Sequence, residues 1–84
     1  MSGKLKVMVI SPEATLFEGE ATSVTAPAFD GEVGILPSHA PMITTLGKGV
    51  LRLGEPATRF QVEGGFLQVV DDVVRVVTEK AAKL

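Results

Sequence analysis

The chain contains no cysteine, tryptophan or tyrosine among its 84 residues. Without cysteine, disulfides, zinc-thiolate sites and thiol nucleophiles are excluded, and the chain must fold without covalent cross-links. Its one histidine, His39, leaves only scattered carboxylates as further metal ligands, so we expect no metal and no cofactor. Four phenylalanines are the only aromatic residues, which is a poor supply for an apolar ligand pocket.

Positive charge is missing from a long central stretch. Between Val7 and Gly47 there is no lysine or arginine, while five acidic residues give this stretch a charge of −5: Glu13, Glu18, Glu20, Asp30 and Glu32. The whole chain has 8 basic and 10 acidic residues, a net charge of −2 that disfavours a dedicated nucleic-acid-binding protein. We interpret the acidic stretch either as a solvated face or as a surface that meets a basic partner.

Long hydrophobic runs are also missing. No segment approaches the roughly 20 apolar residues of a membrane-spanning helix, and the N-terminal segment lacks the apolar run of a signal peptide. We therefore expect any association with a membrane to pass through another protein. The absence of an Arg- and Ser-rich leader favours a bacterial or plastid-encoded origin.

Short alternations of apolar and polar residues dominate the sequence and predict strands, for example at Leu5–Val9, Thr22–Ala26 and Arg59–Glu63. Glycine or proline recurs throughout, which is typical of short strands joined by turns. The pattern predicts an all-β domain over residues 1–84, a flattened β-barrel or sandwich of about 8–10 short strands. The exception is the segment 78–84, whose composition favours a helix too short to be stable alone.

Two local patterns predict how strands are joined. Val70-Asp71-Asp72-Val73 indicates a tight hairpin turn, although Asp-Asp is a weaker signal than Asp-Gly. Gly64-Gly65 indicates a turn or bulge between a strand ending at Glu63 and one starting at Phe66. It is not a phosphate-binding loop, because no Lys-Ser or Lys-Thr follows it.

The segment Phe29–Pro41 is the most informative part of the chain. Two glycines that permit positive φ and two prolines that fix φ set an irregular backbone path: Gly31, Gly34, Pro37 and Pro41. The apolar run 33–36 between them is expected to be buried. Ser38 and His39, with Asp30 or Glu32, superficially offer a catalytic triad. Ser38 and His39 are adjacent between prolines, however, and no nucleophile elbow is present, so we do not expect an enzyme active site.

The run from Gly31 to Pro41, Gly-Glu-Val-Gly-Ile-Leu-Pro-Ser-His-Ala-Pro, resembles the hallmark of the epsilon subunit of F-type ATP synthases. Further blocks agree with this family in order and spacing, at residues 9–20, 48–52 and 62–67. The resemblance covers nearly the whole chain. It implies a β-domain of the central stalk that links the gamma subunit to the membrane c-ring and supports coupling of proton flow to ATP synthesis, without a catalytic site of its own.

The resemblance also implies which residues meet partners: Asp30, Gly31, Glu32, Ser38, His39 and Pro41. In the family, the acid at the position of Glu32 lies close to the polar loop of the c-ring, which commonly carries an arginine, and a charge-assisted contact could form there. The alternative for Glu32 is a solvated turn acid. His39 either braces its loop through backbone hydrogen bonds or lies in the contact with gamma or the ring. Phe29 stands where small or polar residues are more usual, and would add apolar contact area if exposed.

By the same resemblance, the expected partners are gamma and the c-ring, within a complex that also contains alpha, beta and delta subunits. The expected place is the cytoplasmic face of a bacterial membrane, or the stromal face of the thylakoid if the chain is plastid-encoded. Family members commonly continue into a C-terminal helical hairpin, whereas this sequence stops at Leu84, so we expect no C-terminal helical domain. The alternative to the whole interpretation is a free-standing β-sandwich adaptor or ligand-binding module.

Overall fold

Apolar side chains recur at every second position in much of the chain, and these stretches form β-strands. The computed structural model describes residues 3–54 and 57–84. Residues 1 and 2, part of the N-terminal segment assessed above for a signal peptide, lie outside the described residues. The strands are β1 (Leu5–Ile10), β2 (Thr15–Ala21), β3 (Ser23–Ala28), β4 (Gly31–Ile35), β5 (Met42–Thr45), β6 (Lys48–Gly54), β7 (Thr58–Val70) and β8 (Val73–Lys83).

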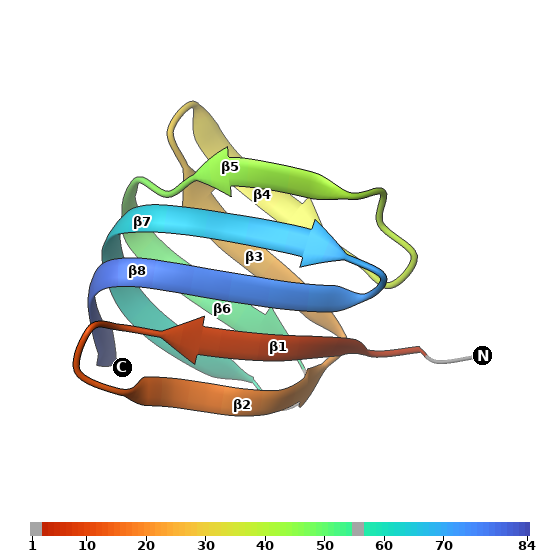
Figure 1. Ribbon diagram of the computed structural model, residues 1–84, viewed down its shortest axis with the longest axis horizontal. Coiled ribbons are helices and arrows are strands. Elements are labelled where there is room, and N and C mark those ends of the chain that lie inside the picture. Colours follow the sequence, from red (N-terminus) through yellow and green to blue (C-terminus); the bar gives the residue numbers. More distant parts are fainter. Residues whose placement is uncertain (1–2, 55–56) are drawn as a thin grey trace.

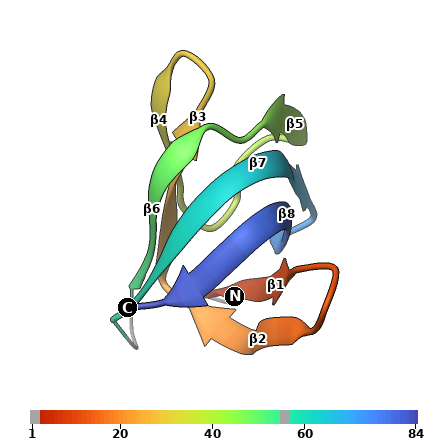
Figure 2. The same cartoon turned by 90° about the vertical axis from the view of Figure 1, so that its left-hand side faces the viewer.

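The strands form one hydrogen-bonded sheet that folds over into two layers (Figures 1 and 2). The strand order is β2-β1-β8-β7-β6-β3-β4, and β5 pairs with β7 outside this path. Strand β8 is parallel to β1 and antiparallel to β7. The prediction of an all-β sandwich is confirmed, although β7 and β8, with 13 and 11 residues, are not short. No helix in the described ranges has the length and apolarity needed to cross a membrane.

The two layers are joined at a corner where neighbouring strands bend together. At this corner Gly64 and Gly65 of β7 have φ angles of +74° and +100°. The Leu46 N–H donates to the Gly65 carbonyl at 2.9 Å, and the Gly64 N–H donates to the Gly47 carbonyl at 3.3 Å. β6 therefore pairs with β7 before the bend, and β5 pairs with β7 after it. The segment that contains β5 and β6 thus runs beside β7 around the corner. Figure 2 shows β7 and β8 curving from one layer into the other.

The glycine pair is therefore a bend inside one strand, where a turn or bulge between two strands was predicted. Pairing of β7 with β8 keeps a single register along its whole length. The buried positions nevertheless shift by one residue at the bend, from Phe60 and Val62 before it to Leu67 and Val69 after it. Positive φ at two successive glycines allows this change of face without breaking the pairing.

The hydrophobic core lies between the layers. Its apolar members are almost completely buried: Leu5, Val7, Val9, Ala21, Val24, Ala26, Ile35, Leu46, Leu51, Leu53, Phe60, Val62, Leu67, Val69, Val74 and Val76. Phe17 of β2 packs edge-on against Phe60 of β7, with ring centroids 6.4 Å apart. β-Branched and aliphatic side chains fill most of this space, which is why the domain needs few aromatic residues.

The C-terminal segment forms a strand, contrary to the helix-like composition noted for residues 78–84. Strand β8 runs to Lys83 and pairs with β7 as far as Phe60. Thr78 is buried, and its hydroxyl donates to the Lys80 carbonyl at 2.9 Å. Seven residues cannot stabilise a helix alone, so pairing along the edge of β7 overrides the local preference.

The apolar run 33–36 is only partly buried. Ile35 points into the core and Val33 is half-buried, but Leu36 is 63% exposed. The expectation of burial is thus wrong for Leu36, because it lies just past the end of β4, where the chain leaves the core. The predicted hairpin turn is confirmed, since Asp71 and Asp72 join β7 to β8 with φ angles of 50° and 62°.

Candidate partner-binding site

The turn between β3 and β4 forms a projecting hairpin tip. Phe29 and Asp30 are its two turn residues, and Gly31 follows with a φ of +129°, a value that strongly favours glycine. Phe29 is 79% exposed and therefore presents its ring to solvent. An exposed aromatic ring on a short rigid hairpin is well suited to contact another molecule.

Glu32 stands on β4 directly after this tip and is held by an arginine from another strand. It pairs across the hairpin with Pro27, which has no N–H to offer. Its Oε1 lies 3.2 Å from Nη2 of Arg52 on β6, with side chains that are 55% and 50% exposed respectively. The carboxylate is therefore accessible and already oriented by a guanidinium.

Ser38 lies in the loop between β4 and β5 and is tied to the far end of the β7–β8 hairpin. Its N–H donates to Oδ1 of Asp72 at 2.6 Å, and its φ of 71° lies in the left-handed region. Asp72 is itself a turn residue with positive φ. A single carboxylate thus fixes the loop to the turn.

His39 and Pro41 occupy the same loop. The His39 N–H donates to the Leu36 carbonyl at 3.1 Å. Its ring Nδ1 lies 2.7 Å from the Ala40 carbonyl and donates to it when Nδ1 carries the proton. These are the backbone contacts of a histidine that braces its own loop, while the half-buried ring still borders solvent. Pro41 lines a shallow hollow with Ile43 and Val70.

The structure therefore divides the predicted site residues into two groups. Asp30, Gly31 and Glu32 lie at the start of β4, whereas Ser38, His39 and Pro41 lie beyond its other end. A five-residue strand spans roughly 15 Å. The two groups can contact different partners, or different parts of one partner, but they do not form one cluster.

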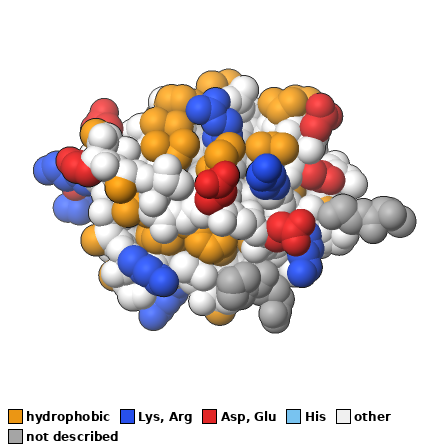
Figure 3. Space-filling view, turned by 60° about the horizontal axis from the view of Figure 1, so that its bottom comes forward, with side chains coloured by type: hydrophobic (Ala, Val, Ile, Leu, Met, Phe, Trp, Pro, Cys, Tyr) orange, Lys and Arg blue, Asp and Glu red, His pale blue; other side chains and the backbone are white. Residues whose placement is uncertain are grey.

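Sequence reasoning missed a broad apolar surface on the outside of the layer formed by β1, β8, β7 and β5. Strand pairing places its half-buried and exposed side chains side by side. We call this surface the outer apolar face; it comprises Met8, Ile10, Ile43, Phe66, Val70, Val73 and Val77. Ile43 is 67% exposed and Val70 is 40% exposed. Figure 3 shows hydrophobic side chains gathered with single charged side chains between them.

A signal for this face was present in the sequence. The runs Val7–Ile10 and Val73–Val77 carry apolar residues at both odd and even positions. In a strand with one solvated face, apolar residues alternate with polar ones. The outward members of these runs had no partner layer in the predicted sandwich. Exposed apolar patches of this kind mark interaction surfaces.

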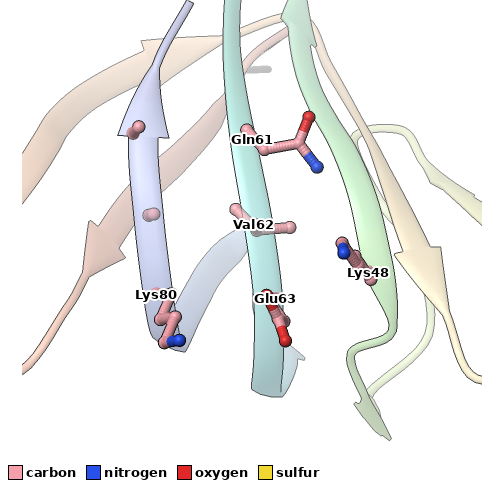
Figure 4. A pocket seen from close by; sticks show the side chains of 7 residues that line it. Lys48, Gln61, Val62, Glu63 and Lys80 are labelled. Atoms are coloured by element: carbon pink, nitrogen blue, oxygen red, sulfur yellow. The ribbon is translucent and has the colours of Figure 1, made fainter.

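The opposite layer carries a row of charges instead. Glu63 of β7 pairs with Lys48 of β6 on one side and Lys80 of β8 on the other, and all three line a shallow hollow with Gln61 and Val62 (Figure 4). Alternating charges on neighbouring strands support strand pairing. The hollow is lined by no histidine and no hydroxyl side chain.

No metal centre is found within residues 3–54 and 57–84. No three His, Asp or Glu side chains in these ranges come together in a way that could hold a metal ion. Every buried side-chain nitrogen and oxygen in this part of the chain has a hydrogen-bond partner. In these ranges no buried side-chain nitrogen or oxygen therefore lacks a hydrogen-bond partner that a ligand would have to supply.

Sequence comparison identifies the family. A model of the ATP synthase delta/epsilon chain β-sandwich domain matches residues 4–84. The chain belongs to this family. Its membership argues against the alternative of an adaptor unrelated to rotary motors.

Curated members of the family are similar to the chain over most of its length. The ATP synthase epsilon chain of Leptospira borgpetersenii serovar Hardjo-bovis (strain JB197) is 49% identical over 81 residues, which are 94% of this chain and 64% of the relative. That of Rhodopirellula baltica is 48% identical over 79 residues, 92% of this chain and 62% of the relative. The chain thus spans less than two thirds of the length of these relatives.

Solved structures share the fold of the family. A chain in the mitochondrial ATP synthase of Euglena gracilis, a structure of OSCP, F1 and the c-ring, superposes with a TM-score of 0.91 at 20% identity, over 99% of this chain and 55% of that chain. A chain in the central stalk and c-ring of Tetrahymena thermophila ATP synthase gives 0.80 at 16% identity, over 94% and 66%. At these identities the likeness concerns the fold.

Proposed function

We propose that this chain is the β-domain of a central-stalk subunit in an F-type proton-translocating ATP synthase. In this role it links the gamma subunit to the c-ring and supports the coupling of proton flow to ATP synthesis. Membership of the delta/epsilon family supports the proposal, as do the names of the relatives. The domain acts mechanically and carries no catalytic site of its own. Its place is the cytoplasmic face of a bacterial membrane or the thylakoid stromal face, where it is held by the complex that also contains alpha, beta and delta.

The observation that supports the proposal is that one domain exposes two separate surfaces suited to contact other molecules. A domain that links two partners needs two surfaces, and it must be rigid enough not to deform between them. The hairpin tip with Phe29 and Glu32 is one such surface, and the outer apolar face is the other. Continuous strand pairing and a filled core join them.

We assign the outer apolar face, with the bordering loop of His39, to gamma. Pro41 of that loop and Ile43 of the face line the same hollow, so loop and face form one continuous surface. An apolar face of this kind is stabilised when a partner covers it. The tip is assigned to the c-ring, whose polar loop commonly carries an arginine in the family, because Glu32 offers an accessible carboxylate there.

Binding to purified gamma tests the assignment of the face. Ile43→Asp places a carboxylate at an exposed position of the face, so the domain should still fold, while an interface there would bury an unpaired charge. We expect the affinity for gamma to fall by at least tenfold, which corresponds to about 1.4 kcal/mol. Isothermal calorimetry or surface plasmon resonance would measure it.

Leu84→Asp is the matched control, because Leu84 is also a large exposed apolar residue, at 58%, and lies next to Arg59 away from the face. Its affinity for gamma should equal that of the wild type. If Ile43→Asp bound as well as the wild type, the face would not be the gamma surface. If the folded wild-type chain did not bind gamma at all, the proposed function itself would be wrong.

A further inference from the structure

The carboxylate of Glu32 already has an internal partner, and this partner stands in an unusual place. Arg52 of β6 lies on the outward side of its strand, opposite Thr25 of β3, and reaches past β3 to Glu32 on β4. On its other side, strand pairing sets Arg52 directly opposite Arg59 of β7. Like charges directly opposite each other on neighbouring strands repel.

Glu32 relieves that repulsion. Among the described residues, it is the carboxylate with which Arg52 forms an ion pair. If a cation of a partner simply drew Glu32 away, Arg52 would face Arg59 without the carboxylate that now pairs with it. A docking partner that supplied an anion to Arg52 while it supplied a cation to Glu32 would avoid this cost.

We propose that Arg52 is a positioning residue for Glu32, and that the two side chains together dock a polypeptide loop that presents a basic and an acidic side chain close together. The inference rests on the proposed function, in which Glu32 meets the ring. Arg52 fixes the direction of the carboxylate before docking and takes the acidic side chain of the loop when the ion pair opens. A planar guanidinium suits this exchange, because it can bind two carboxylate oxygens at once.

The exposure of the pair supports this role over a purely structural one. Both side chains are about half exposed, and an ion pair so accessible to water contributes little to folding stability. The pair can therefore open easily, and variants of Arg52 should remain folded. Its position directly behind the tip that carries the exposed Phe29 places it where a partner would arrive.

The test is binding of the full chain to the purified c-ring of the same organism in detergent, with gamma present. Arg52→Gln should weaken binding by about tenfold or more, the effect of losing a charge-assisted contact, and Glu32→Gln should do the same. The double variant should lose less than the product of the two factors, because the residues act together. Arg52→Lys keeps the charge without the planar fork and should give an intermediate loss.

Lys48→Gln is the matched control. It removes the same charge from the same strand, but Lys48 pairs opposite Glu63 of β7, whereas the ion pair of Glu32 is formed with Arg52. Its binding should stay within about twofold of the wild type. Melting temperatures of all variants would verify that each one folds.

The charge-swapped chain, Glu32→Arg with Arg52→Glu, tests whether the ion pair acts only inside the domain. It can restore the internal ion pair with inverted polarity, so a merely structural pair predicts full recovery of ring binding. Our proposal predicts that binding stays weak. Full recovery, or unchanged binding of Arg52→Gln, would overturn the inference while leaving the proposed function intact. If the folded wild type bound neither ring nor gamma, the proposed function would fail, and the inference with it.

Discussion

Gly65→Ala should be strongly destabilising, because glycine at this position allows the sheet to turn its corner. The φ of Gly65 is +100°, a value that L-residues rarely adopt. An added Cβ would overlap the Val77 carbonyl oxygen and lie 2.7 Å from the Thr78 Cα. Both atoms belong to the backbone of β8, which is hydrogen-bonded to β7 here, so they cannot move aside easily.

The size of the effect can be worked out from these contacts. The left-handed backbone costs an L-residue about 1–2 kcal/mol. The steric overlap adds about 1–3 kcal/mol, as in overpacked cores. Alanine lowers the entropy of the unfolded chain, which offsets about 0.4–1 kcal/mol. The midpoints of these ranges sum to a loss of about 3 kcal/mol, a large share of the roughly 5–15 kcal/mol that stabilises a typical domain.

Urea unfolding followed by circular dichroism measures this loss. With an m-value of about 1 kcal/mol/M for a small domain, the midpoint should fall by about 3 M. Two glycines serve as controls, since an added Cβ would meet nothing within 4 Å at either. Gly31→Ala, at φ +129°, carries only the backbone cost and should lose about 1 kcal/mol. Gly34→Ala should be neutral or slightly stabilising. If Gly65→Ala cost no more than Gly31→Ala, the explanation of the corner would be refuted.

Two further predictions concern the loop and the faces of β8. Asp72→Gly keeps the positive φ of the turn but removes the acceptor of the Ser38 N–H. Exchange of the Ser38 amide with solvent should therefore become at least about tenfold faster, while the free energy of unfolding changes by less than about 1 kcal/mol. Unchanged amide exchange, measured by NMR, would contradict the anchoring role of Asp72. Val76 lies on the inward side of β8, so Val76→Ala should lower the free energy of unfolding, measured in urea, by about 2 kcal/mol. Its neighbour Val77 lies on the outer apolar face, so Val77→Ala should lower it by less than half as much. Equal losses would mean that the assignment of faces is wrong.

The sequence allowed the strands to be predicted wherever one face is buried and the other is polar. Leu5, Val7 and Val9 are buried, as their alternation predicts. The Asp71-Asp72 turn was predictable because acidic residues between apolar runs accept left-handed backbone angles. Local patterns were sufficient at these positions because neighbouring residues determine the outcome.

Non-local contacts explain what could not be predicted. The segment 78–84 has a helical composition and becomes a strand because β7 provides an edge for it. Leu36 is exposed because the strand ends one residue earlier, at Ile35. The bend at Gly64-Gly65 depends on two neighbouring strands that bend with it. Each of these results depends on residues far away in the sequence.

The candidate site follows the same rule. The resemblance of residues 31–41 to a known family indicated which residues to examine, but it did not show that Glu32 binds Arg52, twenty residues away. Nor did it show that Ser38 is anchored by Asp72, thirty-four residues away. The predicted partner-binding roles of the signature residues stay predictions, while their internal partners are now defined.

The central claim, that this domain is part of a rotary stalk, is tested most directly by capture from membranes. A tagged chain, added to gently solubilised membranes of the organism that makes it, would be recovered and its retained proteins quantified by mass spectrometry. A rotary-stalk subunit should retain gamma and c-ring protein together with alpha and beta, and the Ile43→Asp variant should lose gamma. Recovery of none of these subunits by a folded chain would contradict the claim.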